Sequence, residues 1–135
     1  MLLLILGALL ACNDPKPVTD ALHRAEALMN EYPYSAWTLL NTISSDDMEQ
    51  KRNRALYALL YTQAQDKTYR DETNDSLISV AVDYYRDTDD VRHKFLSYYY
   101  NGRVHFNIFS LLILPLLFKE RIRWILTLKV RSTKL

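Results

Sequence analysis

Apolar residues recur at spacings of three and four along most of the chain before residue 108, which is the pattern of helices that bury one side. No stretch there alternates apolar and polar residues in the way that a half-buried strand does. The first stripe predicts a helix that Thr19 or Asp20 caps and that Pro33 ends. Its members are Val18, Ala21, Leu22, Ala25, Leu28, Met29 and Tyr32.

Four further helices follow from the same pattern, over about residues 35–43, 46–66, 77–85 and 91–106. The later half of the third is apolar on two sides, so neighbours must cover it from both directions. One side holds Ala55, Leu56, Leu59 and Leu60, and the other holds Tyr57, Tyr61 and Ala64. The face expected to be buried in the last helix holds Val91, Phe95, Tyr98, Tyr99, Gly102 and Phe106. We expect the hairpin of the third and fourth helices to be the centre of an all-α domain over residues 18–107.

The N-terminus predicts an exported protein. The apolar run of residues 1–11 is too short to span a bilayer, but it has the length of the hydrophobic part of a signal peptide. Leu9-Leu10-Ala11-Cys12 resembles the lipobox of bacterial lipoproteins, and this resemblance implies that residues 1–12 are a lipoprotein signal region with Cys12 acylated. Two or three acyl chains hold a protein stably on a membrane. Residues 13–17 then form a tether. The alternative is an apolar end that buries a free thiol.

The tail over residues 108–135 differs in composition from the rest of the chain. All but one of the 16 acidic residues precede it, whereas it carries six Lys or Arg against the single Glu120. An apolar run from Ile108 to Phe118, interrupted by Ser110 and Pro115, comes before the basic residues. The run of eleven residues is too short to span a bilayer. Two hypotheses remain open. Either the reading frame was disrupted near residue 107, or the tail is a membrane-surface helix, because anionic lipids attract apolar and basic segments.

Small residues recur where helices need close approach, at Ala25, Ala36, Ala58, Ala81 and Gly102. The first and third of them lie 33 positions apart, close to the repeat of about 34 residues of tetratricopeptide proteins. The chain resembles that family, and its residues 98–105 are similar to the first-helix signature of the repeat. This resemblance implies stacked antiparallel helical hairpins, here a degenerate tetratricopeptide-like solenoid fragment.

A narrower resemblance concerns the order of several short segments. Residues 25–29, 33–40, 54–60 and 75–78, followed by Gly102-Arg103-Val104, are similar to the N-terminal region of exported tetratricopeptide proteins of Gram-negative gut bacteria. In those relatives further repeats follow, and often a membrane helix with a signalling or DNA-binding output. The resemblance implies that the chain corresponds to a truncated N-terminal region of such a protein.

The residues that carry chemistry do not form a pattern typical of an enzyme. His23, His93 and His105 are isolated, and acidic pairs stand at turns, where carboxylates cap helices. We therefore expect no catalytic residue, no cofactor and no metal. The acidic balance of the folded region also argues against nucleic acid as a partner.

The ten tyrosines lie on more than one helix face. We expect Tyr85 and Tyr98 in the core, and we take Tyr84 and Tyr100 as candidates for a concave surface that binds a peptide. The leading hypothesis is a non-catalytic, lipid-anchored helical-repeat module that binds a protein or peptide in the bacterial cell envelope. Its location would be the periplasmic or outer-membrane face, and it would be the sensory part of a larger regulator. The alternative is a nonfunctional truncated fragment with a membrane-associating tail.

Overall fold

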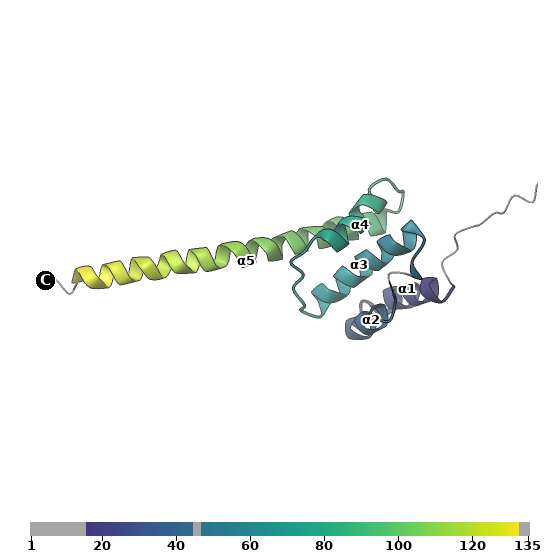
Figure 1. Ribbon diagram of the computed structural model, residues 1–135, viewed down its shortest axis with the longest axis horizontal. Helices are drawn as coiled ribbons and strands as arrows, with labels where there is room; N and C mark the ends of the chain where they lie inside the picture. The colour runs from purple at the N-terminus through teal and green to yellow at the C-terminus, as the bar shows by residue number, and fades with distance from the viewer. Residues whose placement is uncertain (1–15, 45–46, 133–135) are drawn as a thin grey trace, which may run out of the picture.

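The computed structural model describes residues 16–44 and 47–132, with side-chain surroundings as far as Arg123. The predicted signal region and the acylation site Cys12 lie outside the described residues. Figure 1 shows a small helical domain from which one long helix projects. The elements are α1 (Lys16–Leu28), α2 (Pro33–Leu40), α3 (Lys51–Lys67), α4 (Ser76–Tyr85) and α5 (Val91–Ser132). The predicted all-α fold is confirmed for this part of the chain.

Several helix boundaries differ from the predicted ones, including both ends of α1 and the start of α3. α1 begins before Thr19 and Asp20, which therefore lie inside it and do not cap it. It ends early, at Leu28, and Pro33 instead opens α2, where its missing N–H costs no helical hydrogen bond. α3 begins at Lys51, after a short connection that follows α2.

The centre of the fold is α3, which packs against each of the other four helices. Its two apolar sides face two separate core clusters. The side that faces α1 and α2 holds Leu56, Leu60 and Ala64. The side that faces α4 and α5 holds Ala55, Ala58 and Leu59. The prediction that this helix is covered from two sides is confirmed, although its residues are divided between the sides differently than expected.

The inner face of α5, which packs against α3 and α4, is not the predicted one. The side chains buried there are Ser97, Tyr100 and Val104. Phe95 and Tyr98, which were expected in the core, are 66% and 48% exposed. Gly102 is also exposed, and nothing lies within 4 Å of the position that a Cβ would take there. The predicted burial of Tyr98 and Gly102 is therefore wrong.

Polar residues explain why α5 turns this face inward. Arg103 forms an ion pair with Asp66 of α3, and His93 lies against Glu26 of α1. A rotation of α5 that buried Phe95 would turn Arg103 and His93 away from the carboxylates that they contact. The orientation of α5 is thus set by charge pairs as well as by apolar area.

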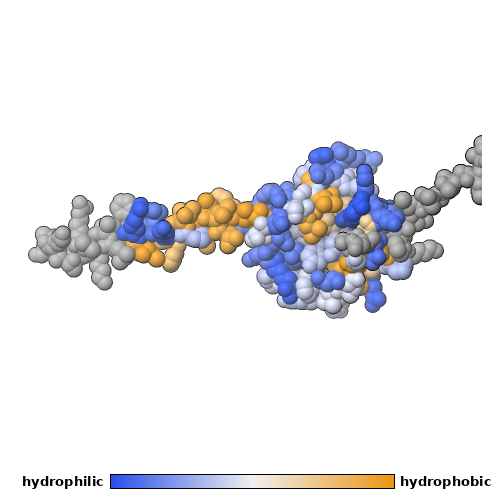
Figure 2. Space-filling model, in the orientation of Figure 1, coloured by the Kyte–Doolittle hydropathy of each residue, from blue (hydrophilic) through white to orange (hydrophobic). Residues whose placement is uncertain are grey.

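Beyond the domain, α5 continues without a break. Ile108 still packs on the core cluster of α4, and the helix then projects away from the domain (Figure 1). Seven large apolar side chains between Phe109 and Phe118 are 59–68% exposed, and Figure 2 shows the hydrophobic surface that they form. Pro115 lies inside this segment and has no N–H to donate to the carbonyl of Leu111. The tail expected to begin at residue 108 is therefore part of the same helix.

The central position of α3 gives a prediction about stability. We expect Leu59→Ala to lower the free energy of unfolding by about 2–5 kcal/mol, because Leu59 is fully buried and its removal leaves a cavity. The matched control is Val80→Ala on α4, which is exposed and should cost no more than about 0.5 kcal/mol. Urea unfolding followed by circular dichroism measures both. Equal losses in the two variants would contradict the central role of α3.

Candidate functional site

The first candidate surface is an open groove between the start of α3 and α4, with a volume of about 470 Å³. Its lining residues are Lys51, Arg54, Val80, Asp83 and Tyr84. The half-buried ring of Tyr84 packs edge-to-face against Tyr85, with 5.1 Å between the ring centroids. Tyr85 itself is buried, as predicted. Two cationic side chains against the one carboxylate of Asp83 give the groove a positive balance, which together with its apolar wall suits a peptide that carries an acidic residue.

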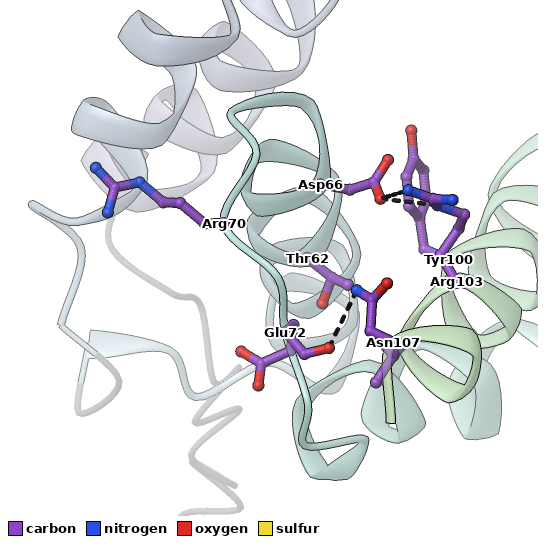
Figure 3. Close-up of a pocket in the computed structure, with 8 residues that line it drawn as sticks. Thr62, Asp66, Arg70, Glu72, Tyr100, Arg103 and Asn107 are labelled. Atoms are coloured by element: carbon purple, nitrogen blue, oxygen red, sulfur yellow. Dashed lines mark hydrogen bonds and ion pairs between the residues drawn. The ribbon is translucent and has the colours of Figure 1, made fainter. Parts of the chain in front are cut away.

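The second predicted partner-binding residue, Tyr100, lies in the core. It is 5% exposed and borders a pocket of only about 10 Å³, enough for a single water molecule. Figure 3 shows that Arg70, also at this pocket, is directed away from the other labelled side chains. Its guanidinium lies over the ring of Trp37, 4.1 Å from the centroid. Because Tyr100 offers almost no surface to a peptide, Tyr84 is the better candidate of the two.

The contacts around this small pocket hold α5 against α3. Oδ1 of Asp66 accepts a hydrogen bond from Nε of Arg103 at 2.8 Å and forms an ion pair with its Nη2, also at 2.8 Å (Figure 3). One turn further along α5, the amide of Asn107 donates to the backbone carbonyl of Glu72 at 3.3 Å. These bonds join α5 to α3 and to the loop after it. The pocket therefore serves attachment of the long helix rather than binding of a ligand.

A second polar cluster attaches the start of α5 to α1. Nδ1 of His93 lies 2.6 Å from Oδ2 of Asp90, and its Nε2 lies 3.0 Å from Oε1 of Glu26. Arg92 also binds Glu26. The imidazole ring stacks on Tyr85, with 5.1 Å between the centroids. Since both ring nitrogens face carboxylate oxygens, the protonated ring can donate to both.

The two carboxyl groups of this cluster are stabilised in their charged forms. Burial alone would raise the pKa of Glu26, but hydrogen bonds from His93 and Arg92 and their positive charges together lower it. Hydrogen bonds from the side chain and backbone of His93 lower the pKa of Asp90 as well, against a smaller effect of burial. The bond from the backbone N–H of His93 also makes Asp90 a cap for α5, which is the role predicted for the acidic pairs at turns.

The three histidines do not converge on one place. His23 is mostly exposed, as expected, and lies 3.9 Å from Glu26, whereas Nε2 of His105 lies 3.9 Å from Oδ2 of Asp75. Within residues 16–44 and 47–132, no group of three or more His, Cys, Asp or Glu side chains is placed to hold a metal ion.

The second candidate surface is the projecting part of α5. Among the described helices, one segment is long and apolar enough to cross a membrane by length and composition, namely Val91–Arg123. Only 6% of its most apolar window is buried inside the protein, so it differs from a core helix of similar composition. An exposed apolar surface of this kind marks a site that lipid or a partner protein covers.

Sequence reasoning named Tyr84 as a candidate, which stays a prediction, and located the apolar run, but it missed the cluster around His93. Nothing in the sequence near His93 indicates that it lies against Glu26, which is 67 positions away. The stacking of Tyr85 on His93 likewise depends on how α4 and α5 meet.

Comparisons with known protein families, with curated proteins and with solved structures find no match for this chain. The function must therefore be inferred from these two surfaces and from the two polar clusters that orient α5.

The lowered pKa values of Glu26 and Asp90 predict acid sensitivity. Carboxyl groups with a lowered pKa in the folded state stabilise the fold above their unfolded pKa, and that contribution is lost as the pH falls through the folded pKa. We expect Glu26→Gln to lower the free energy of unfolding by about 1–2 kcal/mol at pH 7. The difference from the unaltered chain should shrink as the pH falls below about 4.5, the ordinary value for this group.

Chemical unfolding between pH 3 and pH 7 measures this difference. The exposed Glu31→Gln serves as the control and should follow the unaltered chain at every pH. A Glu26→Gln deficit that stays constant down to pH 3 would show that the carboxylate charge does not contribute.

Proposed function

We propose that this chain is a non-catalytic module of the bacterial cell envelope that attaches to a membrane and holds a protein or peptide partner on its helical domain. The observation that carries the proposal is the part of α5 over residues 109–118, which is continuous with the domain and exposes seven large apolar side chains. Attachment through an acylated Cys12 and a tetratricopeptide-like role in partner binding are parts of the proposal that rest on the resemblances.

The apolar surface of α5 favours insertion into a bilayer. Exposed Leu and Phe side chains each gain about 1.5–3 kcal/mol on full transfer out of water. Residues 109–118 lie beyond the contacts of Val104, Asn107 and Ile108 with the domain. They carry no charge and cover about 15 Å of helix at 1.5 Å per residue. Lys119, Arg121 and Arg123 follow directly, where lipid phosphates would meet them. A helix that is apolar all round is suited to the hydrocarbon interior rather than to the membrane surface.

The domain would then present its groove outside the membrane. Tyr84 supplies an aromatic side chain with a polar tip, and Lys51 and Arg54 supply positive charge beside it. Such a combination is typical of protein interfaces, where aromatic residues and arginine contribute most of the binding energy. We propose that the partner docks there with an acidic segment.

Membrane attachment can be tested for each anchor separately. In a Cys12→Ala background, we expect the full chain still to float with vesicles of mixed neutral and anionic lipids. Adding Leu114→Lys and Leu117→Lys should release at least about nine-tenths of it into the soluble fraction, because each lysine costs about 2.5–3.5 kcal/mol in the bilayer. The matched control adds a lysine in place of the exposed Val80 of α4.

Two outcomes contradict this part of the proposal. Flotation of the double-lysine variant at the control level would show that α5 does not insert. Equal palmitate labelling of the unaltered chain and of Cys12→Ala in cells would show that Cys12 is not acylated.

The partner surface can be tested with a photoactivatable phenylalanine analogue. Placed at Tyr84, it should give a discrete crosslinked product in cells, whereas the same analogue at the exposed Tyr34 of α2 should not. Reversing the groove charges with Lys51→Glu and Arg54→Glu should reduce the yield at position 84 at least about fivefold, because the partner's acidic segment would be repelled. Equal yields at the two tyrosine positions would argue against the groove.

A further inference from the structure

A second regular pattern lies on the outer face of α5, turned away from the domain. We define the outer stripe as Val91, Phe95, Tyr98, Gly102, His105, Phe109, Leu112 and Leu116. The steps between successive members alternate between four and three residues along the whole set. Every member is exposed. His105 lies 3.9 Å from Asp75, and the large apolar members of the stripe stay exposed to solvent.

The alternation of four and three gives a mean spacing of 3.5 residues, which is the repeat of helices that wind around one another. The stripe runs over 26 residues, or about 39 Å of helix. It contains no Lys, Arg, Asp or Glu. A surface without these side chains can meet an identical surface without placing two carboxylates, ammonium groups or guanidinium groups opposite each other.

We propose that a second copy of this chain covers the outer stripe, so that two α5 helices pair in parallel. A partner must offer a helix as long as the stripe, and α1 to α4 have only 8–17 residues each. The 42-residue α5 of another copy is long enough. The pairing needs neither the groove at Tyr84 nor the membrane.

The area available is sufficient for a stable dimer. An aromatic side chain buries about 150–250 Å² when it is fully covered, so Phe95, Tyr98 and Phe109, which are about half to two-thirds exposed, each have roughly 100 Å² left to bury. The aliphatic members add a similar total for each copy. Two copies would together bury about 1,000 Å² or more, which is the size expected of a specific interface.

Gly102 supplies an independent reason for close pairing. A glycine inside a helix costs about 1 kcal/mol relative to alanine, and within the domain Gly102 packs against nothing that would offset this cost. At the middle of the stripe it allows two helix backbones to approach closely. Phe95 and Phe109 lie one heptad before and after it and would flank the crossing point.

The parallel direction rests on the proposed function, since both projecting segments must enter the same bilayer. In a parallel pair each stripe residue faces its own copy. In an antiparallel pair that crosses at Gly102, Phe95 would face Phe109 of the other copy instead. Cysteine crosslinking separates these arrangements, because Cys12 is the chain's single cysteine and its removal leaves a clean background.

The test uses the full chain with Cys12→Ala in detergent micelles under mild oxidation. We expect Tyr98→Cys and Phe109→Cys each to form a disulfide-linked dimer with a yield above about one half, and Tyr34→Cys on α2 to give at least about fivefold less. Yields at the two stripe positions no higher than at Tyr34 would overturn the proposal. A crosslink only in a mixture of Phe95→Cys and Phe109→Cys chains would overturn the parallel direction.

A second variant measures the strength of association. Tyr98→Glu should weaken dimerisation roughly 100-fold or more, because two carboxylates would face each other, whereas Tyr34→Glu should not change it. Sedimentation in micelles gives the mass, and circular dichroism confirms that both variants fold. A monomer mass for the unaltered chain would end the proposal. Flotation of Tyr98→Glu should remain normal, so failed pairing and failed membrane attachment are distinguishable.

Discussion

The structure depends on the coverage of α3 from two sides. A helix with apolar residues all round must be buried by neighbours on each side, and here one pair of helices covers each side. Leu59 and Leu60, adjacent in sequence, face different core clusters. This arrangement builds a domain from short helices, most of which would not be stable alone. It also fixes the line along which α5 is attached.

The charge pairs at two points along α5 determine which of its faces is available to other molecules. Glu26 holds the first turns through His93 and Arg92, and Asp66 holds the middle through Arg103. Both carboxylates are more than half shielded from solvent, where ionic contacts are stronger than on an open surface. With these pairs in place, the outer stripe cannot turn inward. The apolar outer stripe therefore stays exposed, because the charge pairs hold α5 with its other face against the domain.

The helices and the burial of α3 on two sides could be predicted from the sequence, because a stripe with the helical period is a local property. It was insufficient for the rotation of α5, since Phe95 and Tyr98 on one face compete with Tyr100 and Val104 on the other. The partners that decide between these faces, Asp66 for Arg103 and Glu26 for His93, lie 37 and 67 positions away. For the same reason, the sequence led to the prediction that Tyr100 lies on a partner-binding surface.

A helix that passes from the domain into the apolar segment without interruption is also a rigid lever. The 42 residues of α5 span about 63 Å, and the backbone at its two ends keeps a fixed angular relation as long as the helix stays intact. A small twist imposed on the first turns would reappear unchanged at the far end. Pro115 is the natural place for such a rod to bend, because there a backbone hydrogen bond is missing. Events at the domain and at the apolar end are in this way mechanically linked.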